Sequence, residues 1–221
     1  MKYLRKFATE ADVVVFNSPN VVLIGNTGEV KYNVPPLYGV YIQHIDGAFY
    51  DEEGWTNGGF SNDEANGVAV ITAKASFVIA KTDLGQMAWS SNTSSTVDGI
   101  LTTADKTTAL TDFAGYDNTQ LMLATDTSGA GYSCANFTFP NGGKGYLPAL
   151  GELNEAYKNK SKINSLMTKI GGAEFQSSSN CYWSSTQDSS DTSWGLRFDY
   201  GYMNSKYKVT SYFYVRAFST L

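Results

Sequence analysis

The chain has 221 residues, a formal net charge of −5, 42% hydrophobic residues and 17% charged residues. A chain of this length can bury one substantial core, so we expect one main domain with a small appendage. The acidic balance excludes a typical nucleic-acid groove, because phosphate contacts require clustered Lys and Arg. Counts of 21 Gly and 15 Tyr with only five Pro predict a domain rich in short strands and loops.

Cysteine content and hydropathy indicate in which cellular compartment the chain folds. With only Cys134 and Cys181, the chain is not a disulfide-dense secreted scaffold, and two buried free thiols are favoured over one bridge. No apolar run of signal-peptide length follows the basic amino-terminal residues, and no stretch of about 20 apolar residues could span a membrane. We therefore expect folding in a cytoplasm and, for any outside target, release by lysis, by a dedicated machine or as part of a particle.

The first residues of the chain predict a small appendage. Residues 9–16 begin with a capping threonine and acids, which is typical of a short helix, and residues 21–24 and 29–32 flank a turn as a hairpin does. Because roughly 30 residues cannot bury a useful core alone, we expect residues 1–36 to serve attachment or oligomerisation. A Pro-Pro pair ends this segment, and residues 37–221 then form the main domain.

The main domain begins with a strand-rich stretch. Apolar alternation or short apolar runs predict strands at residues 38–45, 48–50, 68–72 and 77–80. Asp46-Gly47 is a strong hairpin turn signal between the first two. Residues 51–66 are polar and contain glycines, so we expect a loop there.

Helices are predicted in the middle of the chain. A short helix over residues 107–113 would take Asp105 or Thr107 as its cap, and good helix formers over residues 120–125 favour a second one. A tight turn is expected at residues 141–143, where Asn-Gly-Gly separates two short runs that each end in proline.

The best-defined regular element is an amphipathic helix over residues 148–170. Pro148 suits the first helical position, apolar residues recur at helical spacing, and Gly171-Gly172 provides a stop signal. Asn159 marks a break within it. The apolar stripe of this helix predicts core packing rather than a cofactor site.

The last part of the chain combines two patterns. Residues 181–184, 194–198 and 214–218 predict three strands with large apolar residues. Most of the intervening positions hold Asp, Ser, Thr, Gly, Asn, Tyr, Arg, Val or Phe without periodicity, a composition similar to that of antibody paratopes. We therefore interpret residues 182–218 as a binding surface on a buried scaffold.

Motifs for catalysis and metal binding are scarce in the sequence. His44 is the single histidine, which excludes a multi-histidine metal site, and its alternating strand context favours a structural role. No GxSxG, P-loop, GxGxxG or HExxH pattern occurs. The acids at 51–53 and 63–64 lack EF-hand order and are interpreted as solvated loop acids. We predict no catalytic residue, no metal and no cofactor.

The carboxyl-terminal part also resembles a known family. The resemblance rests on Gly145-Tyr146-Leu147-Pro148 followed by Gly151-Glu152-Leu153, on the run 182–187, on Trp194, Phe198 and Gly201, and on the final run 214–218. These motifs are similar to those of the variable proteins of diversity-generating retroelements, in the versions from gut Bacteroides and their phages. The resemblance covers about residues 38–221 and implies an α+β, C-type lectin-like domain. The first thirty-odd residues also resemble the amino termini of Bacteroides phage structural proteins.

In that family, adenines in a template copy are mutated during reverse transcription, and the variants overwrite the 3′ end of the gene. A template Asn codon of the AAY type can then change only into codons for a restricted set of residues, here called the reachable types. Lys, Gln, Glu, Met and Trp lie outside the set. The resemblance therefore implies that the following residues are framework or come from other codons: Gln187, Trp194, Met203, Lys206 and Lys208. The gap positions between residues 188 and 213 all hold reachable types.

The resemblance implies a diversified surface over about residues 187–213, supported by Trp183, Trp194, Leu196 and Phe198 packed inside. The ligand-binding residues that it implies are Asp188, Ser189, Asp191, Thr192, Gly195, Arg197, Asp199, Tyr200, Tyr202, Asn204, Tyr207, Tyr212 and Phe213. Tyrosines and Phe213 would act as aromatic anchors, and the charged residues as charge-specific contacts.

The expected function is recognition of a host cell-surface protein or glycan by a phage tail-associated protein in the virion, without nucleic-acid binding or membrane insertion. A homotrimer or other phage structural proteins are the expected assembly partners. An adhesin or pilus-tip protein at the bacterial cell surface is the alternative. A third reading is an enzyme of the formylglycine-generating type, which shares the fold. Calcium-dependent sugar binding is not implied, because the lectin motifs of EPN, QPD and WND type are absent.

Overall fold

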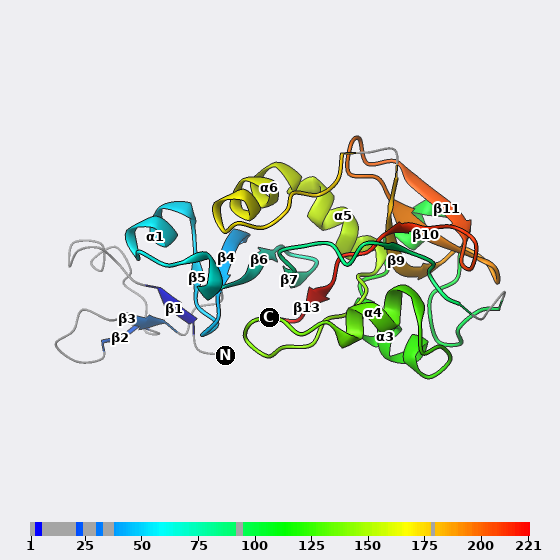
Figure 1. The fold of residues 1–221 in the computed structure, drawn as a ribbon, viewed down its shortest axis with the longest axis horizontal. Helices are drawn as coiled ribbons and strands as arrows, with labels where there is room; N and C mark the ends of the chain where they lie inside the picture. Colours follow the sequence, from blue (N-terminus) through cyan, green and yellow to red (C-terminus); the bar gives the residue numbers. More distant parts are fainter. Residues whose placement is uncertain (1–2, 6–20, 24–29, 33–37, 92–94, 178–179) are drawn as a thin grey trace.

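The computed structural model describes residues 3–5, 21–23, 30–32, 38–91, 95–177 and 180–221. These residues form three β-sheets and six α-helices, and the helices pack on both sides of the two larger sheets (Figure 1). The predicted α+β class is therefore confirmed. Within the described part, no helix is long and apolar enough to cross a bilayer.

A small antiparallel sheet lies at the amino-terminal end. Its strands β1 (Tyr3–Arg5), β2 (Val21–Leu23) and β3 (Val30–Tyr32) have the order β1-β3-β2, and β1 lies beside β5 of the main domain. Pairing of β2 with β3 confirms the predicted hairpin. The helix predicted at residues 9–16 and the Pro-Pro boundary lie outside the described residues.

The central sheet has the order β13-β7-β6-β4-β5 and is antiparallel throughout. Its strands are β4 (Gly39–His44), β5 (Phe49–Tyr50), β6 (Ala65–Ile71), β7 (Ser76–Ile79) and β13 (Phe218–Ser219). The predicted strands and the Asp46-Gly47 turn are confirmed, with Gly47 at φ +92°. Strand β6 is buried along its whole length because both faces of the sheet are covered.

The prediction of a loop over residues 51–66 is wrong. The structure has helix α1 (Glu52–Asn57) and a 3-10 turn, Asn62–Glu64, before β6 begins. Asp51 caps α1, because its carboxylate accepts a 2.7 Å hydrogen bond from the Gly54 backbone N–H. Trp55 is buried, so this polar segment carries one large side chain into the core.

Three short helices follow in the chain. They are α2 (Lys106–Ala109), α3 (Gly115–Leu123) and α4 (Gly129–Asn136), and a two-residue strand β8 (Gln86–Met87) precedes them. Asp105 caps α2, as predicted, with its carboxylate 2.7 Å from the Thr108 backbone nitrogen. Helix α4 was not predicted, because its glycines are poor helix formers; a Cβ at Gly131 would come within 2.7 Å of Met122.

The predicted long amphipathic helix is two helices, α5 (Leu150–Lys158) and α6 (Lys160–Lys169), with the break at Asn159 confirmed. The first helix begins two residues later than predicted, because the Pro148 carbonyl accepts from the Ser185 N–H and ties Pro148 to the sheet. Gly171 ends α6 with φ +68°, the left-handed conformation expected of a C-terminal glycine.

The distal sheet has the order β11-β10-β9-β12-β8, with β12 parallel to β9. Its further strands are β9 (Tyr182–Gln187), β10 (Thr192–Leu196), β11 (Met203–Tyr207) and β12 (Phe213–Tyr214). The prediction of a single strand at residues 214–218 is wrong, because the chain leaves the distal sheet after β12 and enters the central sheet as β13. Strand β11 was not predicted, because its polar side chains show no alternation.

The core consists of two clusters that share the sheets. The first packs α5 and α6 against β4, β6, β7 and β10, and the second packs α3 and α4 against the other side. Alternate residues of β6 serve the two clusters, with Val68 and Val70 in the first and Ala69 in the second. The distal sheet is thus held from both sides, which fixes the strands that carry the site.

Candidate ligand-binding surface

Residues 187–213, here called the variable surface, rest on buried framework residues. Trp194 donates from Nε1 to the Thr103 carbonyl at 2.9 Å, and Trp183 donates from Nε1 to the Met87 carbonyl at 2.9 Å. The predicted burial is confirmed for Trp183, Trp194, Leu196 and Phe198, and Tyr182, Val215, Arg216 and Phe218 are buried as well. Both indole N–H groups therefore have partners, so these residues can be buried without loss of hydrogen bonding.

A buried ion pair secures the strand that runs from one sheet to the other. Arg216 donates from Nε to Asp83 Oδ1 at 2.5 Å and from its Nη atoms to the carbonyls of Ala173 and Glu174. The Arg216 side chain is fully buried and that of Asp83 is 12% exposed. Asp83 also accepts from the Tyr182 hydroxyl at 2.9 Å. The pair and its hydrogen bonds thus join four segments of the chain in the interior.

Gln187 begins the variable surface as a structural residue. Its buried side-chain amide donates to the Val97 carbonyl and to Thr102 Oγ1, both at 3.0 Å, and its Oε1 accepts from the Val97 N–H at 2.8 Å. Gln187 Oε1 also accepts from Lys208 Nζ at 2.7 Å. All the hydrogen-bonding capacity of the Gln187 side chain is used inside the protein, so Gln187 belongs to the framework.

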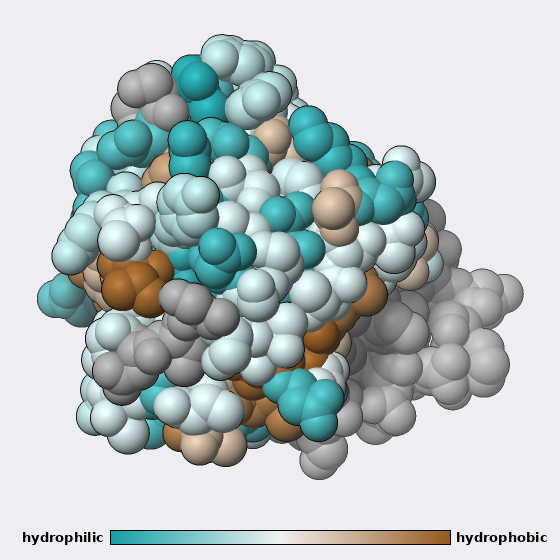
Figure 2. All heavy atoms as spheres, turned by 90° about the vertical axis from the view of Figure 1, so that its right-hand side faces the viewer, coloured by the Kyte–Doolittle hydropathy of each residue, from teal (hydrophilic) through white to brown (hydrophobic). Residues whose placement is uncertain are grey.

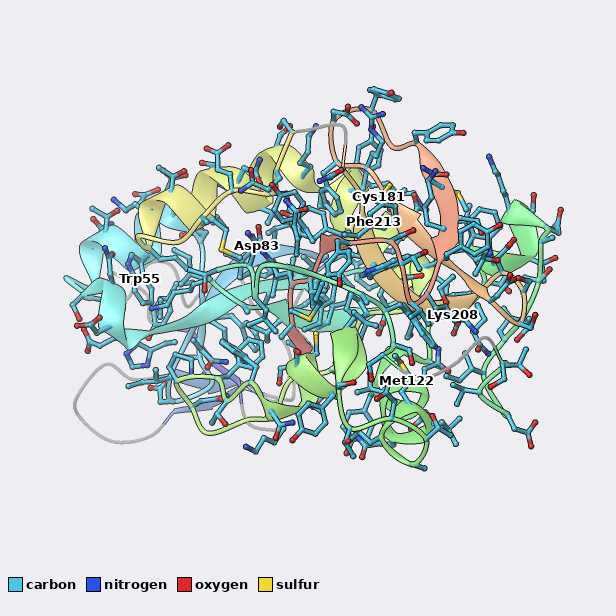
Figure 3. The ribbon with its side chains drawn as sticks, turned by 45° about the vertical axis from the view of Figure 1, so that its right-hand side comes forward. Trp55, Asp83, Met122, Cys181, Lys208 and Phe213 are labelled. Atoms are coloured by element: carbon cyan, nitrogen blue, oxygen red, sulfur yellow. The ribbon has the colours of Figure 1, made fainter. Side chains whose placement is uncertain are left out.

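Lys208 ties the loops beneath the variable surface together (Figure 3). Besides Gln187, its buried ammonium donates to the carbonyls of Ser95, at 3.1 Å, and Ser190, at 2.9 Å, and it lies 4.8 Å from the centre of the Trp89 ring. Three acceptors match the three donors of an ammonium group. Lys208 is therefore framework, which agrees with the implication drawn from its residue type.

The Lys208 ammonium gives the fold a pH dependence. Burial lowers the pKa of Lys208 to about 8 from the ordinary 10.5, while the Asp191 carboxylate acts in the opposite direction. Between these values the unfolded chain binds more protons than the folded one, so this group adds stability as the pH rises. Urea unfolding from pH 7 to pH 10.5 should show the wild-type stability rising relative to Lys208→Met. The matched variant is Lys206→Met on the exposed side, and equal profiles for the two variants would contradict the assignment.

The hairpin before β10 uses its polar side chains internally. Asp188 Oδ2 accepts from Thr192 Oγ1 at 2.7 Å and from Ser205 Oγ at 2.8 Å. Asp191 Oδ1 accepts from Ser189 Oγ at 2.8 Å. These predicted binding residues are half-buried, and their present role is to fix the hairpin conformation.

The turn between β10 and β11 is anchored from several sides. Arg197 forms an ion pair with Asp199, with its Nε 3.1 Å from Asp199 Oδ1. Lys160 of α6 donates to the Asp199 carbonyl at 3.2 Å. Gly201 has φ +75°, and a Cβ there would lie 2.5 Å from the Tyr157 ring. The turn therefore presents its side chains from a fixed backbone, which lowers the entropic cost of binding.

Tyrosines are the most exposed part of the variable surface. The exposed fractions are 63% for Tyr200, 49% for Tyr202, 58% for Tyr207 and 61% for Tyr212. Figure 2 views the molecule from the side that bears the distal sheet in Figure 1, and this side is largely pale to teal, with brown in a patch at the left and an oblique band in the lower part. Among the exposed large hydrophobic residues of 187–213, Val209 at 36% is the one aliphatic side chain, so amphipathic rings provide most of the accessible contact area.

The prediction is wrong for two of the binding residues, because they are buried and not on the exposed surface. Phe213 is 7% exposed and packs on Trp183, with ring centres 4.3 Å apart. Gly195 is buried, and a Cβ there would meet Phe213 at 2.9 Å and Cys181 at 3.0 Å. Figure 3 shows Phe213 and Cys181 together in the distal sheet. Both positions belong to packing, because β12 inserts beside β9.

A buried polar network under β9 was missed by the sequence analysis. Asp112 Oδ2 accepts from Thr186 Oγ1 at 2.8 Å and from Asn118 Nδ2 at 3.0 Å. Glu152 accepts from the Tyr146 hydroxyl and from the Ala149 N–H, at 3.0 and 2.7 Å. Burial raises the pKa of Glu152 to about 8. Thr186 Oγ1 accepts from the Leu150 N–H at 2.9 Å, so Thr186 and Glu152 both satisfy N–H groups at the start of α5, a role that only spatial proximity reveals.

The single histidine and the cysteines lie in different surroundings. His44 is buried against Trp55 and Phe60, and its Nδ1 lies 2.8 Å from Asp46 Oδ1. Cys134 and Cys181 are buried free thiols in the second core cluster, and burial raises the pKa of Cys181 to about 12. Within the described residues, no group of three or more His, Cys, Asp or Glu side chains is gathered as a metal site.

Comparisons with known proteins extend the description of the fold. No protein-family model matches the chain, and no curated protein matches it. A solved structure with a similar fold is that of a fimbrial protein from Bacteroides ovatus ATCC 8483, with a TM-score of 0.59 and 16% sequence identity over 84% of this chain. The chain spans about half, 49%, of the length of that protein. The chain is therefore an α+β protein similar in fold to part of a bacterial fimbrial protein.

Proposed function

We propose that this protein is a non-enzymatic binding protein that recognises a host surface molecule through the exposed side chains of residues 187–213. The observation that carries the proposal is the division within one stretch: its large framework residues are buried, whereas four of its tyrosines are about half or more exposed. A fixed scaffold with rigid amphipathic anchors is what a binding surface requires.

On the basis of the resemblance to retroelement variable proteins, we propose that this surface acts on a phage tail, with a C-type lectin-like domain as the display scaffold. Residues 1–36 would then attach the domain to the particle or to further copies of the chain. Sequencing the locus tests this placement. An adjacent reverse transcriptase and an adenine-biased template repeat are expected, and their absence would remove the retroelement reading.

An adhesin or pilus-tip protein is the second candidate. It is favoured by the fold similarity to a fimbrial protein, which has about twice the length of this chain. The two candidates share the binding surface and differ in what displays it. Immunogold labelling of purified phage particles and of bacterial cells would separate them, since label on cells alone would support the adhesin.

The exposed tyrosines should carry binding with little effect on folding. We expect the double variant Tyr200→Asn, Tyr202→Asn to bind a responsive gut Bacteroides strain at least about tenfold more weakly, because aromatic anchors dominate interface energies. Its unfolding free energy should stay within about 1 kcal/mol of the wild type, since exposed substitutions cost little. Flow cytometry with labelled protein and urea unfolding provide the two measurements.

Tyr38→Asn is the matched control, because Tyr38 is 71% exposed and precedes β4, far from residues 187–213 in the chain. Cell binding that survives the double variant unchanged, or that falls equally in the Tyr38 control, would contradict the proposed surface.

A further inference from the structure

Cations accompany the exposed tyrosines along the β11 edge of the β10–β11 hairpin. The register pairs Ser193 with Lys206 and Gly195 with Asn204, and the Arg197 N–H donates to the Tyr202 carbonyl at 2.9 Å. Asn204 and Lys206 share one side of the edge strand β11 because side chains alternate along a strand, and Tyr202 comes one residue before β11, opposite Arg197. The line considered below runs along this edge from Tyr202 to Lys206. About 14 Å separates the two ends of this line, from four residue steps of about 3.4 Å.

A further cation reaches this line from helix α2. Lys106 Nζ lies 5.2 Å from the centre of the Tyr202 ring, and the Arg197 guanidinium lies 4.5 Å from the centre of the Tyr200 ring. Each of these exposed tyrosines therefore stacks with a cation. Such a pair disfavours a second cation at the ring, so basic groups of a ligand are selected against.

Two of these cations have charge that is available to a ligand. Arg197 is paired with Asp199. Lys106 and Lys206 are exposed, and within the described part of the chain neither forms an ion pair. Asp105, next to Lys106, is engaged in its own helix cap with Thr108. One free positive charge thus lies at the Tyr202 ring, and the other lies four residues along the β11 edge at Lys206.

Resting on the proposed function, we propose that the ligand is an acidic glycan, with Lys106 and Lys206 contacting its acid groups. The faces of Tyr200 and Tyr202 pack against sugar rings, and their hydroxyls bond to the sugar hydroxyls. A sugar ring has an apolar C–H face and a polar rim, which matches the two parts of a tyrosine. The length of the line suits an extended chain with several sugar units rather than a small anion.

Other polyanions fit the line from Tyr202 to Lys206 less well. A nucleic acid or an anionic membrane is bound by many clustered cations, about four to eight for a membrane surface. The protein as a whole has a net charge of −5, and only two free cations lie on this line. A ligand with few, spaced acid groups is the better match.

The test uses the full chain on an array of glycans with carboxylate or sulfate groups and of matched neutral glycans. We expect binding to acidic glycans only, and we expect it to weaken with added salt because the charges are exposed. The double variant Lys106→Gln, Lys206→Gln should bind the best acidic glycan at least about tenfold more weakly. Lys74→Gln, which removes an exposed charge from the β6–β7 turn, is the matched control and should bind as the wild type does.

The outcomes separate this inference from the proposed function. Equal binding of neutral glycans, no binding to any glycan, or full binding by the lysine double variant would overturn the acidic-glycan assignment. If bacterial cells are still bound in a tyrosine-dependent manner in those cases, and protease treatment of the cells abolishes it, the ligand is a protein and the proposed function stands. Cell binding independent of the tyrosines would instead remove the proposed function.

Discussion

Replacing Trp194 with alanine is expected to lower the free energy of unfolding by about 3–5 kcal/mol, the usual cost of removing a buried tryptophan. Trp194 is 4% exposed, lies in the first core cluster, and donates its indole N–H to the Thr103 carbonyl. The substitution removes this contact area and also leaves the Thr103 carbonyl without its partner. Urea unfolding followed by far-UV circular dichroism would give the difference.

Tyr202→Asn is the comparison for Trp194→Ala, because it lies on the same hairpin and is 49% exposed. Its effect on stability should stay within about 0.5 kcal/mol. The interpretation of residues 182–218 as scaffold plus surface requires this contrast. Equal destabilisation by both substitutions would show that the stretch is ordinary core throughout.

Replacing Asp83 with alanine is expected to destabilise the fold by about 3–5 kcal/mol, because it leaves a buried charge without its counter-ion. The Arg216 side chain is fully buried, so its guanidinium cannot turn to water. The Tyr182 hydroxyl loses its acceptor in the same change. Thermal and urea unfolding would both report the loss.

Asp98→Ala is the matched control for Asp83, since Asp98 is exposed and accepts only from the neighbouring Gly99 N–H among the hydrogen bonds described. The control should change the unfolding free energy by less than about 0.5 kcal/mol. A double variant with Arg216→Met should recover part of the loss from Asp83→Ala, since the stranded charge is then absent. No recovery would indicate that packing, not charge, is the dominant contribution of the pair.

The sequence predicted most of the regular elements where local signals were strong. Periodicity identified the α5–α6 pair and its break at Asn159, and the Asp46-Gly47 signal identified the first hairpin of the central sheet. Prediction from the sequence failed where tertiary contacts override the local secondary-structure preference. Helix α4 contains glycines that are disfavoured in helices, yet Gly131 allows close packing against Met122.

The candidate site was predicted at the level of residue types rather than of individual roles. The unreachable types Gln187 and Lys208 are buried framework, as the resemblance implied. Phe213 has a reachable type and an aromatic ring, which suggested an anchor, but its burial depends on how β12 lies beside β9. Such a distinction depends on long-range strand pairing, which residue type does not encode.

The passage of residues 213–219 from β12 to β13 has a consequence for the order in which the sheets form. Tyr214 pairs with Tyr182 in the distal sheet, whereas Phe218 pairs with Ile79 and bridges to Tyr146. Residues 213–219 thus contribute one strand to each of the two five-stranded sheets. Contacts of such high sequence separation form late and slow folding. A chain truncated before Phe213 would therefore lack a strand of both sheets, so the surface on the distal sheet depends on residues that follow it in the chain.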